Sequence, residues 1–208
     1  DTIGELLARE NITVSRATIW RLLRSEGRVT PQPQKRPRSS WQRFNADRPN
    51  ELWQSDFTHT QLVDGTEVEI IAWIDDHSRY LLHLSVHPRI TVRIVMDTFT
   101  RAADDHGYPA ATLTDNGMVF TTRYARNARG IAPGNGFETL LALQGITQKN
   151  GRPFKPTTQG KIERFWQTLK RRLATQPADS LDTLQATLDT FREHYNTVRP
   201  HRALARHT

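Results

Sequence analysis

The chain has 208 residues, with 29 Lys and Arg against 22 Asp and Glu, so its formal net charge is +7 and its isoelectric point is about 10.2. A basic balance makes a polyanion, most commonly nucleic acid, the first partner to consider. The lack of Cys excludes disulfides, Cys-ligated zinc, iron–sulfur clusters and thiol catalysis, and it is typical of a reducing compartment. The longest apolar run, residues 70–74, is far shorter than the ~20 residues of a membrane span, so we expect no membrane partner.

Residues 2–27 have the apolar spacing of two short helices joined by a turn. Ser15 is a good N-cap for the second helix, and Gly27 ends it. This pattern predicts a partial helix-turn-helix DNA-binding domain over residues 1–27, although a simple helical hairpin has the same pattern. Because the chain does not begin with Met, we expect it to be part of a longer protein that holds the first helix of this domain. The expected DNA-facing residues of the second helix are Arg16, Thr18 and Arg21.

A basic, proline-rich segment at residues 28–50 predicts a linker, because closely spaced prolines prevent regular structure and stiffen the chain. It is a solvated tether or a tether that lies along DNA phosphates, and the two interpretations are compatible. The linker residues expected to meet DNA are Lys35, Arg36 and Arg38.

From residue 51 onward, strand patterns and helix patterns alternate. Strands are predicted at 52–63, 68–74, 80–86, 111–114 and 146–149, and helices at 91–106, 137–143, 158–173 and 181–195. Three antiparallel strands followed by helices and further strands predict an α/β fold of the ribonuclease-H-like type, with a mixed five-stranded sheet and flanking helices. We expect this core to span residues 51–196 and to be followed by a basic C-terminal tail, residues 197–208.

Charge is distributed unevenly along this core. Residues 51–115 hold 11 acids against four Arg and no Lys, whereas residues 149–172 hold eight basic residues against the single acid Glu163. The first part is suited to binding cations and the second to binding anions.

Three acids lie at unusual positions. Asp56 is inside an apolar strand, Asp115 follows a short strand and precedes Asn-Gly, and Glu163 lies beside the apolar face of a helix. Each has an ordinary explanation as well, namely a strand Asp that faces solvent, a turn residue and a surface ion pair. Together they are the oxygen ligands that Mg²⁺ prefers, and two ions held by such a trio can clamp the attacking and leaving oxygens of a phosphodiester.

Five segments of the chain carry a family resemblance. In chain order they are Trp53–Thr58, Trp73–Arg79, Thr114–Gly117, Gln159–Phe165 and Tyr195–Leu204. In order and spacing they resemble the DDE transposases with a retroviral-integrase-type catalytic core, in the bacterial insertion-sequence branch. The resemblance extends from about residue 50 to the end of the chain, and it identifies residues 51–196 as an integrase-type catalytic core.

The resemblance implies a Mg²⁺-dependent polynucleotidyl transferase that cuts DNA at the ends of a mobile element and transfers the cut strand to a target. Asp56, Asp115 and Glu163 would be the catalytic acids and metal ligands, with two Mg²⁺ ions per site and Mn²⁺ as a substitute. Double-stranded DNA would be the partner, with a homo-oligomer assembled on it, in the cytoplasm and nucleoid of a bacterium. The residues implied to face DNA near the cleavage point are Lys161, Gln167 and Lys170.

Two neighbouring features follow from the same resemblance. Asn116 and Gly117 would shape the loop beside Asp115. The Asp75–Asp76 pair would close the hairpin between the second and third strands, so we leave it out of the site.

The chain departs from the family pattern in two places. Asp115 and Glu163 are separated by 47 residues, more than in the compact retroviral cores, and we interpret the extra length as a surface insertion at residues 121–136. Gln159 stands where the family commonly has Asn, and we expect activity to survive because Gln keeps the amide.

Two other functions are compatible with the same residues. A catalytically silent DNA-binding remnant or regulator would be favoured by the loss of one acid of the trio, and all three are present. A nuclease of the same fold would cut by hydrolysis alone, without strand transfer.

Overall fold

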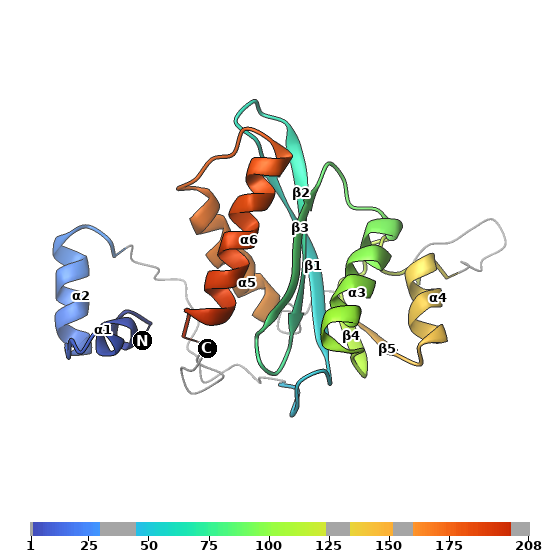
Figure 1. Ribbon diagram of the computed structural model, residues 1–208, viewed down its shortest axis with the longest axis horizontal. Helices are drawn as coiled ribbons and strands as arrows, with labels where there is room; N and C mark the ends of the chain where they lie inside the picture. Colours follow the sequence, from blue (N-terminus) through green and yellow to red (C-terminus); the bar gives the residue numbers. More distant parts are fainter. Residues whose placement is uncertain (1, 30–44, 124–133, 152–159, 201–208) are drawn as a thin grey trace.

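The computed structural model describes residues 2–29, 45–123, 134–151 and 160–200. Within these ranges a five-stranded sheet lies between two pairs of helices (Figure 1). Helices α5 (Gly160–Leu173) and α6 (Leu181–Thr197) cover one face of the sheet, and helices α3 (Val92–His106) and α4 (Gly136–Leu143) cover the other. This layered arrangement confirms the ribonuclease-H-like core that the order of strands and helices predicts.

The sheet is mixed, with the strand order β3-β2-β1-β4-β5. Strands β1 (Trp53–Gln61), β2 (Glu67–Asp75) and β3 (Leu81–His87) form an antiparallel meander. Strand β4 (Ala111–Thr114) runs parallel to β1, and β5 (Thr147–Asn150) runs parallel to β4. Strand β1 is therefore central, with one antiparallel and one parallel neighbour.

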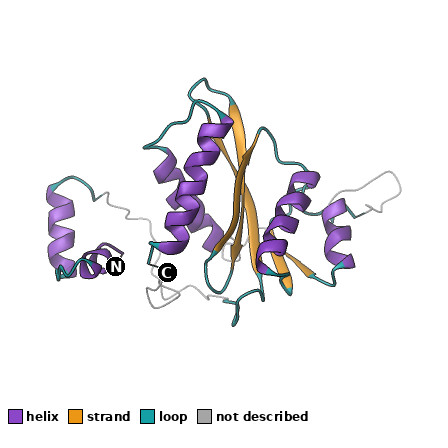
Figure 2. Cartoon of the chain, in the orientation of Figure 1, coloured by secondary structure: helices purple, strands orange, loops and turns teal. Residues whose placement is uncertain are grey.

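The sheet separates two hydrophobic cores, as its position between the helices in Figure 2 illustrates. Along β2, successive side chains point to opposite faces because a strand has a period of two. Ile70, Ala72 and Ile74 pack with α5 and α6, whereas Ile71 and Trp73 pack with α3 and α4. A strand that is buried on both faces reads as a continuous apolar run, which is the pattern of residues 70–74.

The outer edge of β3 is covered by polar side chains of α6. Gln185, Arg192 and Asn196 lie on one side of the helix, and they make six hydrogen bonds of 2.6–3.2 Å with backbone groups of β3. The backbone groups belong to Leu81, Leu82, Leu84 and Val86. Because an unpaired strand edge is a template for pairing with another chain, these side chains protect the sheet at this end.

The N-terminal helices α1 (Thr2–Arg9) and α2 (Arg16–Ser25) form the predicted helical pair. Ser15 is the N-cap of α2, and its Oγ accepts a hydrogen bond from Thr18 N at 3.1 Å. Gly4 lies where the two helices meet, and a Cβ there would lie 3.5 Å from Ile19 Cδ1, an ordinary van der Waals contact. The two helices are thus present, and their role as a DNA-binding helix-turn-helix stays a prediction.

The bounds of the core elements agree with the sequence prediction to within two residues wherever the structure describes them. Helix α6 continues to Thr197, and the residues after it pack against the protein: the Arg199 guanidinium lies 5.3 Å from the centroid of the Tyr195 ring, and Pro200 is buried. Most of the predicted linker, insertion and C-terminal tail lies outside the described residues, in 30–44, 124–133 and 201–208. No helix in the described part of the chain is both long and apolar enough to cross a bilayer.

Replacing Arg192 with Ala should destabilise the protein. The Arg192 guanidinium donates to the carbonyl oxygens of Leu81 and Leu82, so its loss should lower the free energy of unfolding in urea by about 1.5–3 kcal/mol. The exposed Arg171 of α5 provides the control, and Arg171→Ala should change the free energy of unfolding by less than about 0.5 kcal/mol. Equal losses in the two variants would show that covering the edge of β3 contributes no stability.

Candidate active site

Asp56 is held in the middle of the central strand by two N–H donors. Its side chain is on the face of β1 that meets α5, and it is partly buried. Asp56 Oδ1 accepts from Phe57 N at 2.9 Å, and Asp56 Oδ2 accepts from the indole Nε1 of Trp166 at 3.0 Å. A carboxylate has about four acceptor positions, so each oxygen retains a lone pair beyond these two bonds.

The charge state of Asp56 reflects its burial and its acidic neighbours. Burial is the larger cause, and together with the charges of Asp115 and Glu163 it raises the pKa of Asp56 from 3.8 to about 6. The two hydrogen bonds partly oppose this rise. Like charges that act on one another in this way indicate that the three predicted acids lie in one neighbourhood.

Asp115 reaches this neighbourhood through the register of the sheet. Trp53 and Gln54 of β1 pair with Thr112 and Leu113 of β4, and two further steps of that parallel register lead to Asp56 and Asp115. The carboxyl end of β4 is where open α/β sheets commonly place ligand sites.

The loop after Asp115 fixes the direction of its carboxylate. Gly117 N donates to Asp115 Oδ1 at 2.9 Å, and a Cβ on Gly117 would approach that oxygen to 3.0 Å. Asn116 Nδ2 donates to Gly151 O at 2.9 Å, which ties the loop to the end of β5. The predicted role of Asn116 and Gly117 in shaping this loop agrees with these contacts.

Glu163 lies in the first turn of α5, and its side chain is exposed. Partial burial raises the pKa of Glu163, and the neighbouring Arg164 opposes the rise. Trp166, one turn further along the same helix, anchors α5 on β1 beside Asp56. An exposed Glu side chain can change rotamer, so the position of its carboxylate is less restricted than that of the two aspartates.

The carboxylates of the three acids are not arranged around one common metal position. No group of three or more His, Asp or Glu side chains within the described residues is arranged to hold one ion. The donor set nevertheless suits a hard divalent cation, because Asp56, Asp115 and Glu163 supply carboxylate oxygens only. The buried Oδ1 of Asn116 adds an oxygen for which no hydrogen-bond partner is found among the described residues.

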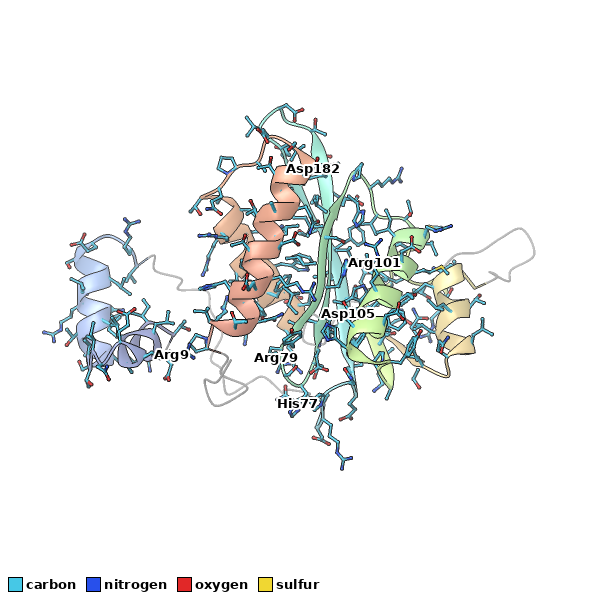
Figure 3. The ribbon with its side chains drawn as sticks, in the orientation of Figure 1. Arg9, His77, Arg79, Arg101, Asp105 and Asp182 are labelled. Carbon is cyan, nitrogen blue, oxygen red and sulfur yellow. The ribbon has the colours of Figure 1, made fainter. Side chains whose placement is uncertain are left out.

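The Asp75–Asp76 pair closes the β2–β3 hairpin. Asp75 Oδ1 accepts from Ser78 N and Ser78 Oγ at 2.7 Å each, which is the hydrogen bonding of a turn. Asp76 Oδ1 accepts from Gln54 Nε2 at 2.6 Å. His77 and Arg79 belong to the connection between β2 and β3, at one end of the sheet (Figure 3). These contacts support leaving both aspartates outside the site.

Lys161 also belongs to this structural network. Its Nζ forms an ion pair with the Asp76 carboxylate and donates to Asp76 O at 3.3 Å. Burial lowers the pKa of Lys161, and Asp76 opposes that change. The ammonium group is therefore engaged within the fold, and its predicted contact with DNA stays a prediction.

The other predicted DNA-facing residues occupy two exposed surfaces. Gln167 and Lys170 are exposed on α5, four and seven residues after Glu163 and thus on the same side of the helix. On α2, Arg21 Nη2 donates to Thr18 Oγ1 at 3.3 Å, and all the predicted residues of that helix are exposed. The predicted linker contacts, Lys35, Arg36 and Arg38, lie outside the described residues.

Trp166 is the residue of the site that the sequence did not reveal. Its position at helical spacing with Ile162 and Leu169 predicts a core residue, which it is, with 6% of its surface exposed. The polar end of the indole is the available signal, since a buried Trp usually places its N–H on an acceptor. Nothing in the local pattern identifies that acceptor as Asp56.

Without divalent cations, Asp56→Asn should stabilise the protein at high pH. Folding raises the pKa of Asp56, so protonation of this group favours the folded state. The resulting stabilisation is fully present below pH 3.8 and is lost as the pH rises through about 6. The variant should exceed wild type by about 3 kcal/mol at pH 8, and the two should converge below pH 4. Urea unfolding across this pH range tests it, with the exposed Asp104→Asn as the control. A difference between wild type and Asp56→Asn that does not vary with pH would contradict it.

Comparison with known proteins shows which family this chain resembles. Two models of the integrase core domain match the chain, one over residues 46–156 and one over residues 144–208. An uncharacterized 31.7 kDa protein of insertion element IS407 from Burkholderia multivorans is 28% identical over 96% of this chain. The transposase for insertion sequence element IS904 from Lactococcus lactis is 28% identical over 81% of it. The chain spans 69% and 63%, respectively, of the lengths of these relatives.

Solved structures show the same fold. A chain of the simian T-cell lymphotropic virus intasome, solved with the PP2A regulatory subunit B56 gamma, has a TM-score of 0.62 and 21% identity, covering 89% of this chain and 62% of that chain. The HTLV-2 integrase catalytic core, solved with magnesium, has a TM-score of 0.53 and 21% identity, covering 72% of this chain and 88% of that chain. Since an integrase core model matches more than half of its length, the chain belongs to the integrase core domain family.

Proposed function

We propose that this chain is the catalytic part of an insertion-sequence transposase, which cuts DNA at the ends of its element and transfers the cut strands to a target. Family membership and the relatives from insertion elements support this proposal. The observation that carries it is that two acids distant in sequence, Asp115 after β4 and Glu163 on α5, both raise the pKa of Asp56 on β1.

The metal requirement follows from the same three residues. We infer that the carboxylates of Asp56, Asp115 and Glu163 hold Mg²⁺, with two ions per site and Mn²⁺ as a substitute. Each oxygen of Asp56 accepts one hydrogen bond and keeps a lone pair, so the carboxylate would be able to help hold a divalent cation. Divalent ions bound there would activate the attacking oxygen and stabilise the leaving oxygen of the phosphodiester.

Residues of α5 would position the DNA. Gln167 and Lys170 are exposed on the same side of the helix as Glu163, which supports the proposal that they face DNA near the cleavage point. Lys170 provides charge and Gln167 a neutral amide, and neither contact distinguishes base sequence. We expect α2 to supply the sequence-reading contacts.

Two element ends must be joined to one target, so we propose that two or more copies assemble on double-stranded DNA. One structural neighbour, from simian T-cell lymphotropic virus, was solved as an intasome. We place the reaction in the bacterial cytoplasm, at the nucleoid. A catalytically silent regulator is disfavoured because all three acids are retained, and strand-transfer products would separate a transposase from a nuclease that only hydrolyses.

Removing the charge of any one acid should abolish strand cleavage. Asp56→Asn, Asp115→Asn and Glu163→Gln keep shape and lose the negative charge that holds Mg²⁺. Each variant should cleave element-end DNA at least about 100-fold more slowly with Mg²⁺ while binding that DNA nearly as well as wild type. The exposed Asp104→Asn should cleave normally. Cleavage at a near wild-type rate by any one of the three variants would remove that residue from the site.

Substitutions on α2 and α5 should separate sequence recognition from general DNA binding. Arg16→Ala and Arg21→Ala should weaken binding to element ends more than binding to random DNA, because base contacts specify the sequence. Lys170→Ala should weaken binding to the two DNAs alike. It should also reduce the slope of log affinity against log salt concentration by about one, because one phosphate contact is lost. Affinities measured over a range of salt concentrations test this. Equal losses on the two DNAs for the α2 variants would show that α2 does not read sequence.

A further inference from the structure

Asp56 has two hydrogen-bond donors of different origin. Phe57 N belongs to the next residue of β1, so this bond depends only on the local conformation of the strand. Trp166 Nε1 comes from α5, 110 residues away in the sequence. The indole bond is thus the one of the two that connects the carboxylate of Asp56 to a different element.

The same helix carries Glu163. Trp166 follows Glu163 by three residues, so the two side chains lie near each other on adjacent turns of α5. Where α5 lies on β1 therefore decides where Glu163 lies relative to Asp56. The Trp166–Asp56 hydrogen bond is a direct polar contact across that junction, at 3.0 Å.

An indole suits this place for chemical reasons. Its N–H donates only and carries no charge, so it orients a carboxylate without neutralising it and without competing as a ligand. A Lys or Arg here would repel a cation, and a His would compete to bind it. The ring itself is anchored in the core, where its centroid lies 4.8 Å from that of Phe165.

We propose that Trp166 is a positioning residue for the metal site. Its indole N–H holds Oδ2 of Asp56 on β1, and because Trp166 lies on α5, this bond fixes the position of Asp56 relative to Glu163 of the same helix. This inference rests on the proposed function, because it assumes that the acids bind a divalent cation. Neighbours that orient a metal ligand commonly change metal affinity by about 10- to 100-fold when they are removed.

The test uses Trp166→Phe, which keeps an aromatic ring in the core and removes the N–H. Trp73→Phe is the matched control, since Trp73 is fully buried and its Nε1 donates to Thr98 Oγ1 at 3.1 Å on the opposite face of the sheet. Both variants lose one buried indole hydrogen bond, so both should unfold at a lower temperature than wild type.

The readout is the rise in unfolding temperature on adding MgCl₂, because a ligand that binds only the folded state stabilises it according to its affinity. Trp73→Phe should keep the wild-type rise, whereas Trp166→Phe should need about 10- to 100-fold more Mg²⁺ for the same rise. An unchanged Mg²⁺ response in Trp166→Phe would overturn the inference and leave the proposed function standing. If MgCl₂ did not raise the unfolding temperature of the wild-type protein, the proposed metal site and this inference would both be wrong.

A second measurement applies if Trp166→Phe does not fold. The indole N–H resonances of wild-type protein labelled with ¹⁵N can be followed during a Mg²⁺ titration. The Trp166 signal should shift with Mg²⁺, and the Trp73 signal should stay nearly constant. A Trp166 signal that moves no more than that of Trp73 would contradict the positioning role.

Discussion

The pairing of β1 on both sides is the constraint on which the site depends. Because β1 is antiparallel to β2 and parallel to β4, it is fixed in the centre of the sheet, and Asp56 is fixed with it. The parallel register with β4 brings Asp115 to the adjacent strand end, and the apolar side chains of β2 and β3 provide the surface on which α5 and α6 pack. A slip of one residue in β1 would turn Asp56 to the opposite face, toward α3.

The site contains negative charges that repel one another, together with hydrogen bonds that hold the carboxylates in place. Burial and neighbouring acids raise the pKa of Asp56, so its charged form costs folding free energy. The N–H groups of Phe57 and Trp166 offset part of this cost at Asp56. The hydrogen bonds at Asp56 and Asp115 also direct the two carboxylates. A fold selected for stability alone would not place these acids together, and such local cost is typical of a functional site.

Polar side chains outside the site have a different task in this fold. The Asp76–Lys161 ion pair joins the β2–β3 turn to the start of α5, and the α6 side chains cover the edge of β3. Both sets of contacts link elements that are distant in sequence, so they hold the helices on the sheet that carries Asp56. Lys170 and Arg171 of α5 are exposed to solvent and take no part in these contacts.

The sequence by itself determined the elements of the core, and it predicted the three acids of the candidate site. Helical and strand periodicity and turn residues are local signals, and the order of the motifs around Asp56, Asp115 and Glu163 is specific. Only the tertiary structure decided which partners these side chains meet. The bonds from Trp166 to Asp56 and from Lys161 to Asp76 span 110 and 85 residues. No local pattern encodes them, because a buried Trp and a charged Lys can each satisfy their donors on many acceptors, and the choice is made only when packing brings one acceptor within reach.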